Sequence, residues 1–317
     1  MEQLKLYELS QPFDYGYLQV SQVHIIYYEQ IGNPKGKPIL FIHGGPGSGM
    51  SDFNKRLFDP KVYRGIFFDQ RGCGKSCPLA ELAENTTWDL VEDIETLRKF
   101  FEIDKWIVCG GSWGVTLGLL YGQLYPSHVL AFILRGIWLN RPTEIKWLYQ
   151  EGGASKIFPE AWKDFIAPIP EKERHDMLSA YYKRLTGNNE MDKLEYATTF
   201  AIWEMSTYRL TPRENELREE LFDPNILVYS TLECHYFTNN SFLTSSNQIL
   251  ENINRIKHIP CTIINGRYDI VCPVQTAIEL HEAWPSSELK IPIEGHAGDS
   301  PGTVKELLKA IDNYVAI

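Results

Sequence analysis

The chain has 317 residues, of which 44% are hydrophobic and 23% charged, and this composition excludes a disordered chain, a collagen-like repeat and a coiled coil. Because 317 residues exceed what one small domain needs, we expect a core that carries an inserted module. The formal net charge of −10 disfavours a nucleic-acid partner, since binding to phosphate relies on clustered cations.

Apolar runs of strand length alternate with helical patterns along most of the chain. Several runs are continuous, as in parallel strands that are covered by helices on both faces. The alternation therefore predicts an α/β fold with a mostly parallel sheet. The expected strands are residues 23–28, 38–42, 65–68, 106–109, 129–134, 261–264 and 289–293, and the expected helices are 88–101, 115–125, 273–284 and 303–315.

The middle of the chain has a different pattern. Between about Asn140 and Asn254 the strand signals nearly vanish, and charged helical patterns replace them at 172–185 and 214–222. We predict a helical module, inserted after the strand at 129–134, that accounts for the excess length. The expected division is a first core segment at 1–139, a helical cap at 140–254 and a second core segment at 255–317.

No segment predicts a membrane protein or a secreted one. Residues 106–134 lack Asp, Glu, Lys and Arg. However, this stretch contains several glycines near its start, and Gln123 and Pro126 near its end. It therefore fits two buried strands around a helix better than a membrane span. Residues 1–13 contain no apolar run of signal-peptide length, and the six cysteines form no C-x-x-C pair. We expect a cytoplasmic protein with neither a zinc site nor a disulfide framework.

The strongest chemical signal is Gly110-Gly111-Ser112-Trp113-Gly114, which has the form G-x-S-x-G. It lies between an expected strand and an expected helix. Such a turn strains the serine backbone and exposes its hydroxyl at the carboxyl end of the sheet, and the glycines leave the room that this needs. This context makes Ser112 the predicted nucleophile.

A serine nucleophile needs a base, and the base needs a carboxylate that orients it. Asp269 follows the strand at 261–264, and His296 follows the strand at 289–293. Both therefore lie at carboxyl ends of strands, where side chains converge on one crevice, in the chain order Ser, acid, His. Asp299 is the rival acid, but it follows the histidine and breaks this order.

The oxyanion of an acyl-transfer reaction requires two backbone N–H donors. The amide of Trp113, directly after the nucleophile, is the first candidate. The second is Gly45 in His43-Gly44-Gly45-Pro46-Gly47, which follows the strand at 38–42. We expect His43 to support this loop and not to act as a base.

Together these motifs resemble the proline iminopeptidases, a family of serine peptidases with the α/β-hydrolase fold. The resemblance rests on His43-Gly-Gly-Pro-Gly47, Asp69-Gln-Arg-Gly-Cys-Gly-Lys-Ser76, Gly110-Gly-Ser-Trp-Gly114 and Gly266-Arg-Tyr-Asp269. It implies release of an N-terminal proline from short peptides, without a metal or a cofactor. It further implies that Glu204 and Glu233 hold the free imino group, and that Trp138 and Tyr149 form the wall of the proline pocket.

Two alternatives remain open at this stage. One is a carboxylesterase or a broader aminopeptidase on the same scaffold. The other is a hydrolase-fold protein that binds without turnover, which the presence of Ser112, Asp269 and His296 disfavours. An aspartate-nucleophile hydrolase is disfavoured because the G-x-S-x-G turn carries serine.

Overall fold

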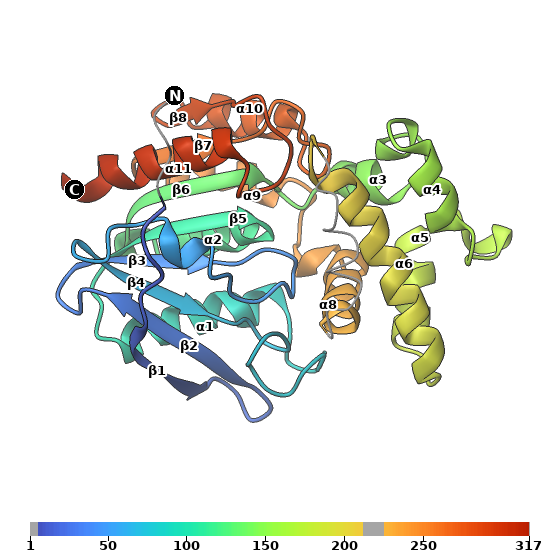
Figure 1. The fold of residues 1–317 in the computed structure, drawn as a ribbon, viewed down its shortest axis with the longest axis horizontal. Coiled ribbons are helices and arrows are strands. Elements are labelled where there is room, and N and C mark those ends of the chain that lie inside the picture. The colour runs from blue at the N-terminus through green and yellow to red at the C-terminus, as the bar shows by residue number, and fades with distance from the viewer. Residues whose placement is uncertain (1–5, 212–224, 317) are drawn as a thin grey trace.

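The computed structural model describes residues 6–211 and 225–316 (Figure 1). The described strands form an eight-stranded sheet in the order β1-β2-β4-β3-β5-β6-β7-β8. β1 to β2 and β2 to β4 are antiparallel pairs, and the other neighbours are parallel. The predicted α/β class with a mostly parallel sheet is therefore confirmed. The strands are β1 (Pro12–Gln19), β2 (Ile25–Gly32), β3 (Lys37–Ile42), β4 (Tyr63–Phe68), β5 (Trp106–Ser112), β6 (Val129–Ile137), β7 (Cys261–Ile264) and β8 (Glu288–Lys290).

The two edges of the sheet differ from the sequence prediction. β1 was not predicted, because its aromatic residues Phe13, Tyr15 and Tyr17 alternate along an edge strand and point to solvent instead of forming a buried run. At the other edge, β8 ends at Lys290 although we expected it to continue to Ile293. Pro292 follows two residues later, and proline has no N–H to donate to a neighbouring strand.

Helices cover both faces of the sheet. On one face α1 (Thr87–Phe100), α2 (Trp113–Leu124) and α10 (Val274–Ala283) pack into one apolar cluster, whereas α11 (Pro301–Asn313) packs into a second cluster on the other face. The strands alternate between the two clusters: Val108 of β5 lies in the first, and Ile107 and Cys109 lie in the second. The predicted helix at 88–101 begins one residue earlier, where Thr86 and Asp89 form a capping box.

Every described secondary-structure element between β6 and β7 is a helix. Helices α3 to α6 lie beside the sheet, at the right of Figure 1. The predicted helix at 172–185 starts only at Met177, because the Asp176 side chain accepts from the Ser179 N–H and caps it there. The predicted helix at 214–222 lies outside the described residues. The α-helices of this segment are α3 (Pro142–Tyr149), α4 (Pro159–Ile166), α5 (Met177–Leu185), α6 (Glu190–Tyr208), α8 (Ile226–Thr238) and α9 (Gln248–Glu251).

The described helices differ from membrane-spanning helices. Over residues 6–211 and 225–316, none combines the length and the apolar character needed to cross a membrane.

Candidate active site

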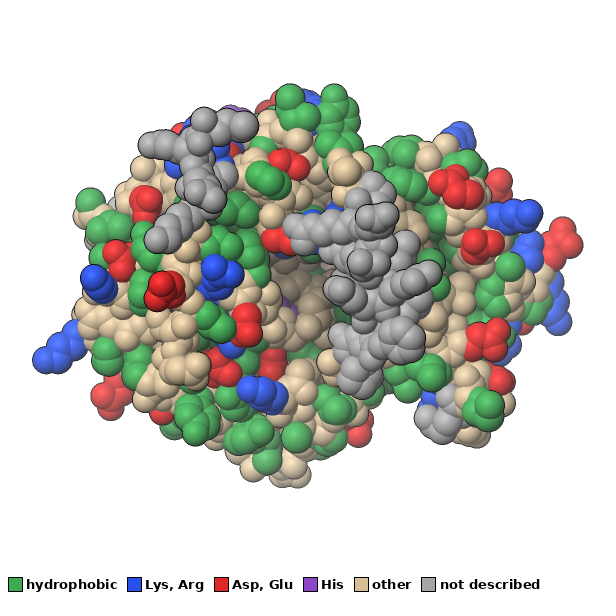
Figure 2. Space-filling view, in the orientation of Figure 1, with side chains coloured by type: hydrophobic (Ala, Val, Ile, Leu, Met, Phe, Trp, Pro, Cys, Tyr) green, Lys and Arg blue, Asp and Glu red, His purple; other side chains and the backbone are tan. Residues whose placement is uncertain are grey.

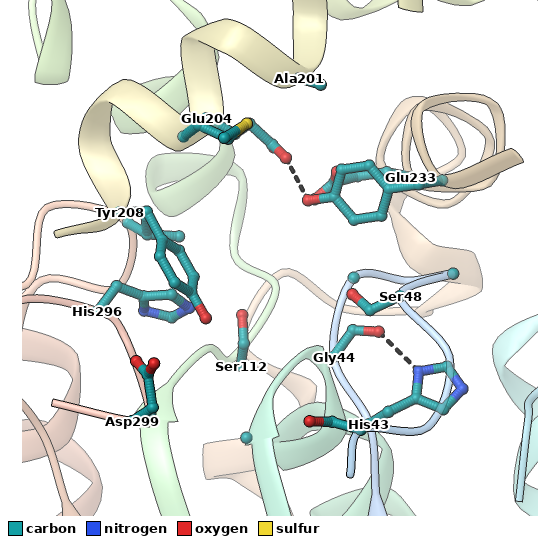
Figure 3. A pocket seen from close by; sticks show the side chains of 18 of the residues that line it. His43, Gly44, Ser48, Ser112, Ala201, Glu204, Tyr208, Glu233, His296 and Asp299 are labelled. Carbon is teal, nitrogen blue, oxygen red and sulfur yellow. Dashed lines mark hydrogen bonds between the residues drawn. The ribbon is translucent and has the colours of Figure 1, made fainter. Parts of the chain in front are cut away.

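Ser112 is the last residue of β5 and directly precedes the first residue of α2. Its backbone has φ 56° and ψ −121°, a conformation that residues other than glycine rarely adopt. The turn leaves no room for further side chains: a Cβ at Gly110 would lie 2.4 Å from the Gly114 carbonyl oxygen, and a Cβ at Gly114 would lie 2.3 Å from that of Ile42. The sequence thus folds into a tight strand-to-helix turn that points the Ser112 hydroxyl into an open space (Figure 3).

His296 and Asp269 form a buried pair beside this turn. The His296 Nδ1 atom lies 2.9 Å from Asp269 Oδ2 and 3.1 Å from Oδ1, so Nδ1 donates to the carboxylate. The carboxylate also accepts the backbone N–H of Cys272 at 2.7 Å. The rival Asp299 is engaged elsewhere, since Arg209 Nη1 donates to it at 2.6 Å. Of the two candidate acids, Asp269 is therefore the one that contacts the His296 ring.

The other imidazole nitrogen of His296, Nε2, faces the Arg135 guanidinium, with Nη1 at 3.5 Å. Arg135 also donates to the His296 carbonyl oxygen at 2.9 Å and so fixes the loop that carries the histidine. Ser112 Oγ lies 4.0 Å from Cys272 Sγ, and no hydrogen bond joins it to His296 in the described part of the chain. Serine Oγ moves by rotation about χ1, and hydrogen bonds between catalytic groups often tighten only when substrate is bound.

The glycine-rich loop after β3 passes next to Ser112. A Cβ at Gly44 would lie 3.2 Å from the Gly111 carbonyl oxygen and 3.5 Å from Ser112 Cβ, so a side chain here would crowd the Gly111 carbonyl. Gly45 has φ +102°, again a conformation suited to glycine. The predicted oxyanion-hole residues Gly45 and Trp113 thus lie on the two segments that meet at Ser112.

His43 and Gln70 connect this loop by hydrogen bonds to Trp113, the first residue of α2. His43 Nδ1 donates to the Gly44 carbonyl oxygen at 2.9 Å, and His43 Nε2 accepts the Gln70 backbone N–H at 3.0 Å. Both ring nitrogens are used, and burial lowers the pKa of His43, so the ring is a neutral structural element. The Gln70 side chain donates to the His43 carbonyl oxygen at 2.9 Å and accepts the Trp113 indole N–H at 2.9 Å.

A cavity of about 810 Å³ opens above Ser112, and Figure 2 shows it as a hollow between the sheet domain and the helical segment. Its floor includes Gly45, Ser112 and His296, and its far side includes residues of α6 and α8 such as Met205 and Ile226. A substrate in this cavity would therefore contact both the strand ends and the helical segment.

Glu204 of α6 and Glu233 of α8 lie at the helical end of this cavity, with exposed fractions of 8% and 4%. The Tyr149 hydroxyl contacts Glu204 Oε1 and lies 3.1 Å from Glu233 Oε1, and the Tyr229 hydroxyl contacts Glu204 Oε2. Burial raises the pKa of Glu204, and burial together with the nearby Glu204 charge raises the pKa of Glu233 well above its usual value. The site thus presents carboxyl groups with no ion-pair partner among the described residues to any cationic group that enters.

Trp138 and Tyr149 lie behind the lining of the cavity and not in it. The Trp138 ring is buried against Phe237 at 5.6 Å between centroids. The Tyr149 ring stacks on Phe200 at 5.3 Å, and only its hydroxyl reaches the two glutamates. Their assignment as walls of a proline pocket stays a prediction.

Within the described residues, one cluster combines side chains that bind metals. Ligand atoms of Asp269, Cys272 and His296 all lie within 4.8 Å of one another. The His296 Nδ1 atom and the Asp269 carboxylate already bond to each other. Burial raises the pKa of Cys272 well above its usual value, and this keeps its thiol neutral.

Sequence reasoning missed three polar residues of the site, namely Gln70, Tyr229 and Arg135. Gln70 lies in the quoted Asp69–Ser76 motif, but its bonds to the His43 loop and to Trp113 join segments far apart in the chain. Tyr229 precedes Glu233 by four residues, and that spacing places both on one face of α8. A search for polar residues at helical spacing from Glu233 would have found it.

Comparisons with known proteins show which family and fold this chain resembles. A family model described as the alpha/beta hydrolase fold matches residues 37–298. A probable proline iminopeptidase of Leptolyngbya boryana is 49% identical over 314 residues, which cover 98% of this chain and 97% of the relative. A proline iminopeptidase of Arabidopsis thaliana is 46% identical over 314 residues, covering 98% of this chain and 82% of the relative.

Among solved structures, an esterase from Exiguobacterium antarcticum superposes with a TM-score of 0.66. The alignment covers 95% of this chain and 99% of the esterase, at 20% sequence identity. At this identity the likeness shows a shared fold.

Proposed function

The chain belongs to the proline iminopeptidase family of α/β hydrolases, and from this membership we propose that it is a serine exopeptidase that releases N-terminal proline from short peptides. One observation carries the proposal beyond family membership. The cavity joins Ser112 at one end to the buried carboxyl pair Glu204 and Glu233 at the other. A peptide with a free, cationic N-terminus can place its carbonyl group at Ser112 and its positive charge at the carboxyl pair. A blocked or neutral substrate leaves the carboxyl pair without a partner.

We infer a mechanism in which Ser112 attacks the carbonyl carbon of the N-terminal residue. His296 accepts the hydroxyl proton on Nε2, while Asp269 holds Nδ1–H and stabilises the imidazolium that forms. The oxyanion accepts hydrogen bonds from the backbone N–H groups of Gly45 and Trp113. Trp113 opens α2, where a helix leaves its first N–H groups without intrahelical partners, so its amide is available.

The acyl-enzyme is then resolved by water. The acyl-enzyme forms when His296 returns its proton to the leaving amine. His296 then takes a proton from the attacking water and passes it to Ser112 Oγ as the acyl C–O bond breaks, which releases free proline and restores the Ser112 hydroxyl. Every proton transfer uses chain residues already described, and no cofactor takes part in the proposed scheme.

We further propose that residues 140–254 form a cap that closes the substrate cavity. The support is that α6 and α8 supply the Glu204 and Glu233 side chains, while the sheet domain supplies Ser112 and His296. We infer a cytoplasmic setting for the same chain, and its six cysteines are all free thiols. The proposed partners are short peptides with a free N-terminal proline.

The test compares proline p-nitroanilide, alanine p-nitroanilide, N-acetylproline p-nitroanilide and p-nitrophenyl butyrate as substrates. We expect proline p-nitroanilide to have the highest kcat/KM of the anilides, and its N-acetyl derivative to be cleaved at least a hundred-fold less well. Cleavage of the ester alone would instead identify a carboxylesterase, and comparable rates on proline and alanine would identify a broader aminopeptidase. Labelling of Ser112 by a fluorophosphonate separates all of these from a protein that only binds.

A further inference from the structure

The glutamates at the helical end of the cavity share hydrogen-bonding groups that fix where a proton must sit. Three helices contribute to this cluster: Tyr149 from α3, Glu204 from α6, and Tyr229, Glu233 and Cys234 from α8. Among the described residues, no lysine, arginine or histidine forms an ion pair with either glutamate. The groups that bond the two carboxyls are therefore neutral hydroxyls.

Counting hydrogens shows that these bonds cannot all form with two ionised carboxylates. Tyr149 has one hydroxyl hydrogen, yet its oxygen contacts Glu204 Oε1 and also lies 3.1 Å from Glu233 Oε1. If Tyr149 donates to one carboxylate, the oxygen of the other faces the lone pairs of the hydroxyl. Two buried carboxylates that both carry a charge would also repel each other in a medium of low polarity. One proton on the pair removes both conflicts.

The hydroxyl partners decide which glutamate carries this proton. Glu204 is contacted by two tyrosine hydroxyls, Tyr149 on Oε1 and Tyr229 on Oε2, and donors of this kind stabilise the ionised form. Tyr149 lies 3.1 Å from Glu233 Oε1, and the Glu233 Oε2 atom is buried without a hydrogen-bond partner in the described part of the chain. Burial and the nearby Glu204 raise the pKa of Glu233 by more than Tyr149 and Tyr229 lower it. A negative charge is thus better stabilised by hydrogen bonds on Glu204 than on Glu233.

We propose that the free enzyme holds one negative charge on Glu204 and one proton on Glu233, connected as Glu233 O–H to Tyr149 O–H to Glu204 carboxylate. The proposal rests on the proposed function, since it explains how this site recognises an N-terminal amine. Burial raises the pKa of Glu233 well above that of an exposed glutamate, in the direction that the arrangement requires.

This arrangement matches the chemistry of an N-terminal proline. The protonated imino group carries one positive charge and two N–H donors. Glu204 supplies the single opposing charge, and Glu233 Oε2, which is then a carbonyl oxygen, supplies a neutral acceptor that is otherwise without a partner. The charges of site and substrate cancel, so no charge is left unpaired at the buried end of the cavity.

The kinetic test compares Glu204→Gln, Glu233→Gln and the double variant with proline p-nitroanilide at pH 8. Glutamine resembles a protonated glutamate, because it keeps a carbonyl oxygen and replaces the O–H donor by N–H. We expect Glu233→Gln to lower kcat/KM by about ten-fold, and Glu204→Gln and the double variant by at least about a hundred-fold, mainly through KM. Equal losses in the two single variants, or a larger loss in Glu233→Gln, would overturn the proposal.

Two controls keep the result interpretable. The rate of fluorophosphonate labelling of Ser112 does not require the amine site, so a variant that is labelled at the wild-type rate has an intact fold and nucleophile. Infrared difference spectra between wild type and Glu233→Gln should show the C=O stretching band of a protonated carboxylic acid in the wild type only. The absence of that band would contradict the proposal whatever the kinetics. If the band is present but proline p-nitroanilide is not cleaved, the proposed function fails and the proton assignment stands.

Discussion

The indole N–H of Trp113 donates to Gln70 Oε1 at 2.9 Å, in a part of the core that solvent does not reach. The same Gln70 side chain donates to the His43 carbonyl oxygen at 2.9 Å. One amide therefore connects the turn that carries the nucleophile with the loop that carries Gly45. We infer that Gln70 is a positioning residue, which sets the distance between the two proposed oxyanion donors.

Replacement of Gln70 by alanine should separate these two segments. We expect Gln70→Ala to lower kcat by about ten-fold to a hundred-fold with little change in KM, because loss of a single oxyanion donor lowers kcat by about a hundred-fold to a thousand-fold. Steady-state kinetics on proline p-nitroanilide measure both constants. Gln123→Ala is the matched control, since Gln123 is also buried but bonds to the Ile249 carbonyl oxygen instead. A kcat loss of the same size in the control would mean that Gln70 acts only through stability.

Replacement of Ser112 by alanine removes the proposed nucleophile. We expect kcat to fall by about four to six orders of magnitude, as for triad deletions in other serine hydrolases. Labelling by fluorophosphonate should disappear as well. Ser286→Ala is the control, because the Ser286 hydroxyl is exposed and bonds to the Lys257 carbonyl oxygen. Residual activity above one per cent in a preparation free of wild-type enzyme would rule out the mechanism.

Replacement of Tyr229 by phenylalanine removes a hydrogen-bond donor to Glu204 while keeping the ring. Because hydrogen bonds to charged groups contribute more than neutral ones, we expect KM for proline p-nitroanilide to rise by about ten-fold or more. The kcat value should change less, since Tyr229 does not contact the reacting carbonyl in the proposed mechanism. Tyr182→Phe serves as the control, because that hydroxyl lies 3.0 Å from His235 Nδ1 and away from the glutamates. An unchanged KM in Tyr229→Phe would remove Tyr229 from the amine site.

The raised pKa of Glu233 also predicts how stability depends on pH. Its value in the unfolded chain is near 4.5, and burial raises it in the folded protein. Above pH 4.5 the folded state therefore binds more protons than the unfolded state, so this group lowers the free energy of unfolding as pH rises. Glu233→Gln has no ionisable carboxyl at this position, so its free energy of unfolding does not fall with pH for this reason. We therefore expect its melting temperature to exceed that of wild type at pH 8.

The melting-temperature difference between Glu233→Gln and wild type should shrink as pH falls towards 4.5. Thermal unfolding followed by circular dichroism at several pH values measures it. Glu282→Gln, at an exposed position of α10, should show no such trend. A Glu233→Gln variant that is less stable than wild type at pH 8, with a gap that does not depend on pH, would contradict the expected sign.

Much of the fold follows from local pattern. The strand at 106–109 and the helix after it could be predicted because a continuous apolar run, a glycine-rich turn and a second apolar run follow one another directly. The place of Ser112 at a strained turn could be predicted for the same reason, since the strain at its backbone is created by its immediate neighbours. β1 could not, because its burial depends on pairing with β2 at an edge and not on its own sequence.

By itself, the sequence determined which residue types were available and in what order: Ser112, then Asp269, then His296, with glycines on both sides of the nucleophile. Only the tertiary structure showed the partners of Asp269 and Asp299, because only there does one carboxylate meet His296 while the other meets Arg209. It also brought Glu204 and Glu233 together with Tyr149 and Tyr229, and these four residues come from three separate helices. The physical reason is that a hydrogen bond depends on distances of a few ångströms between side chains, and spacing along the chain fixes such distances only within one element.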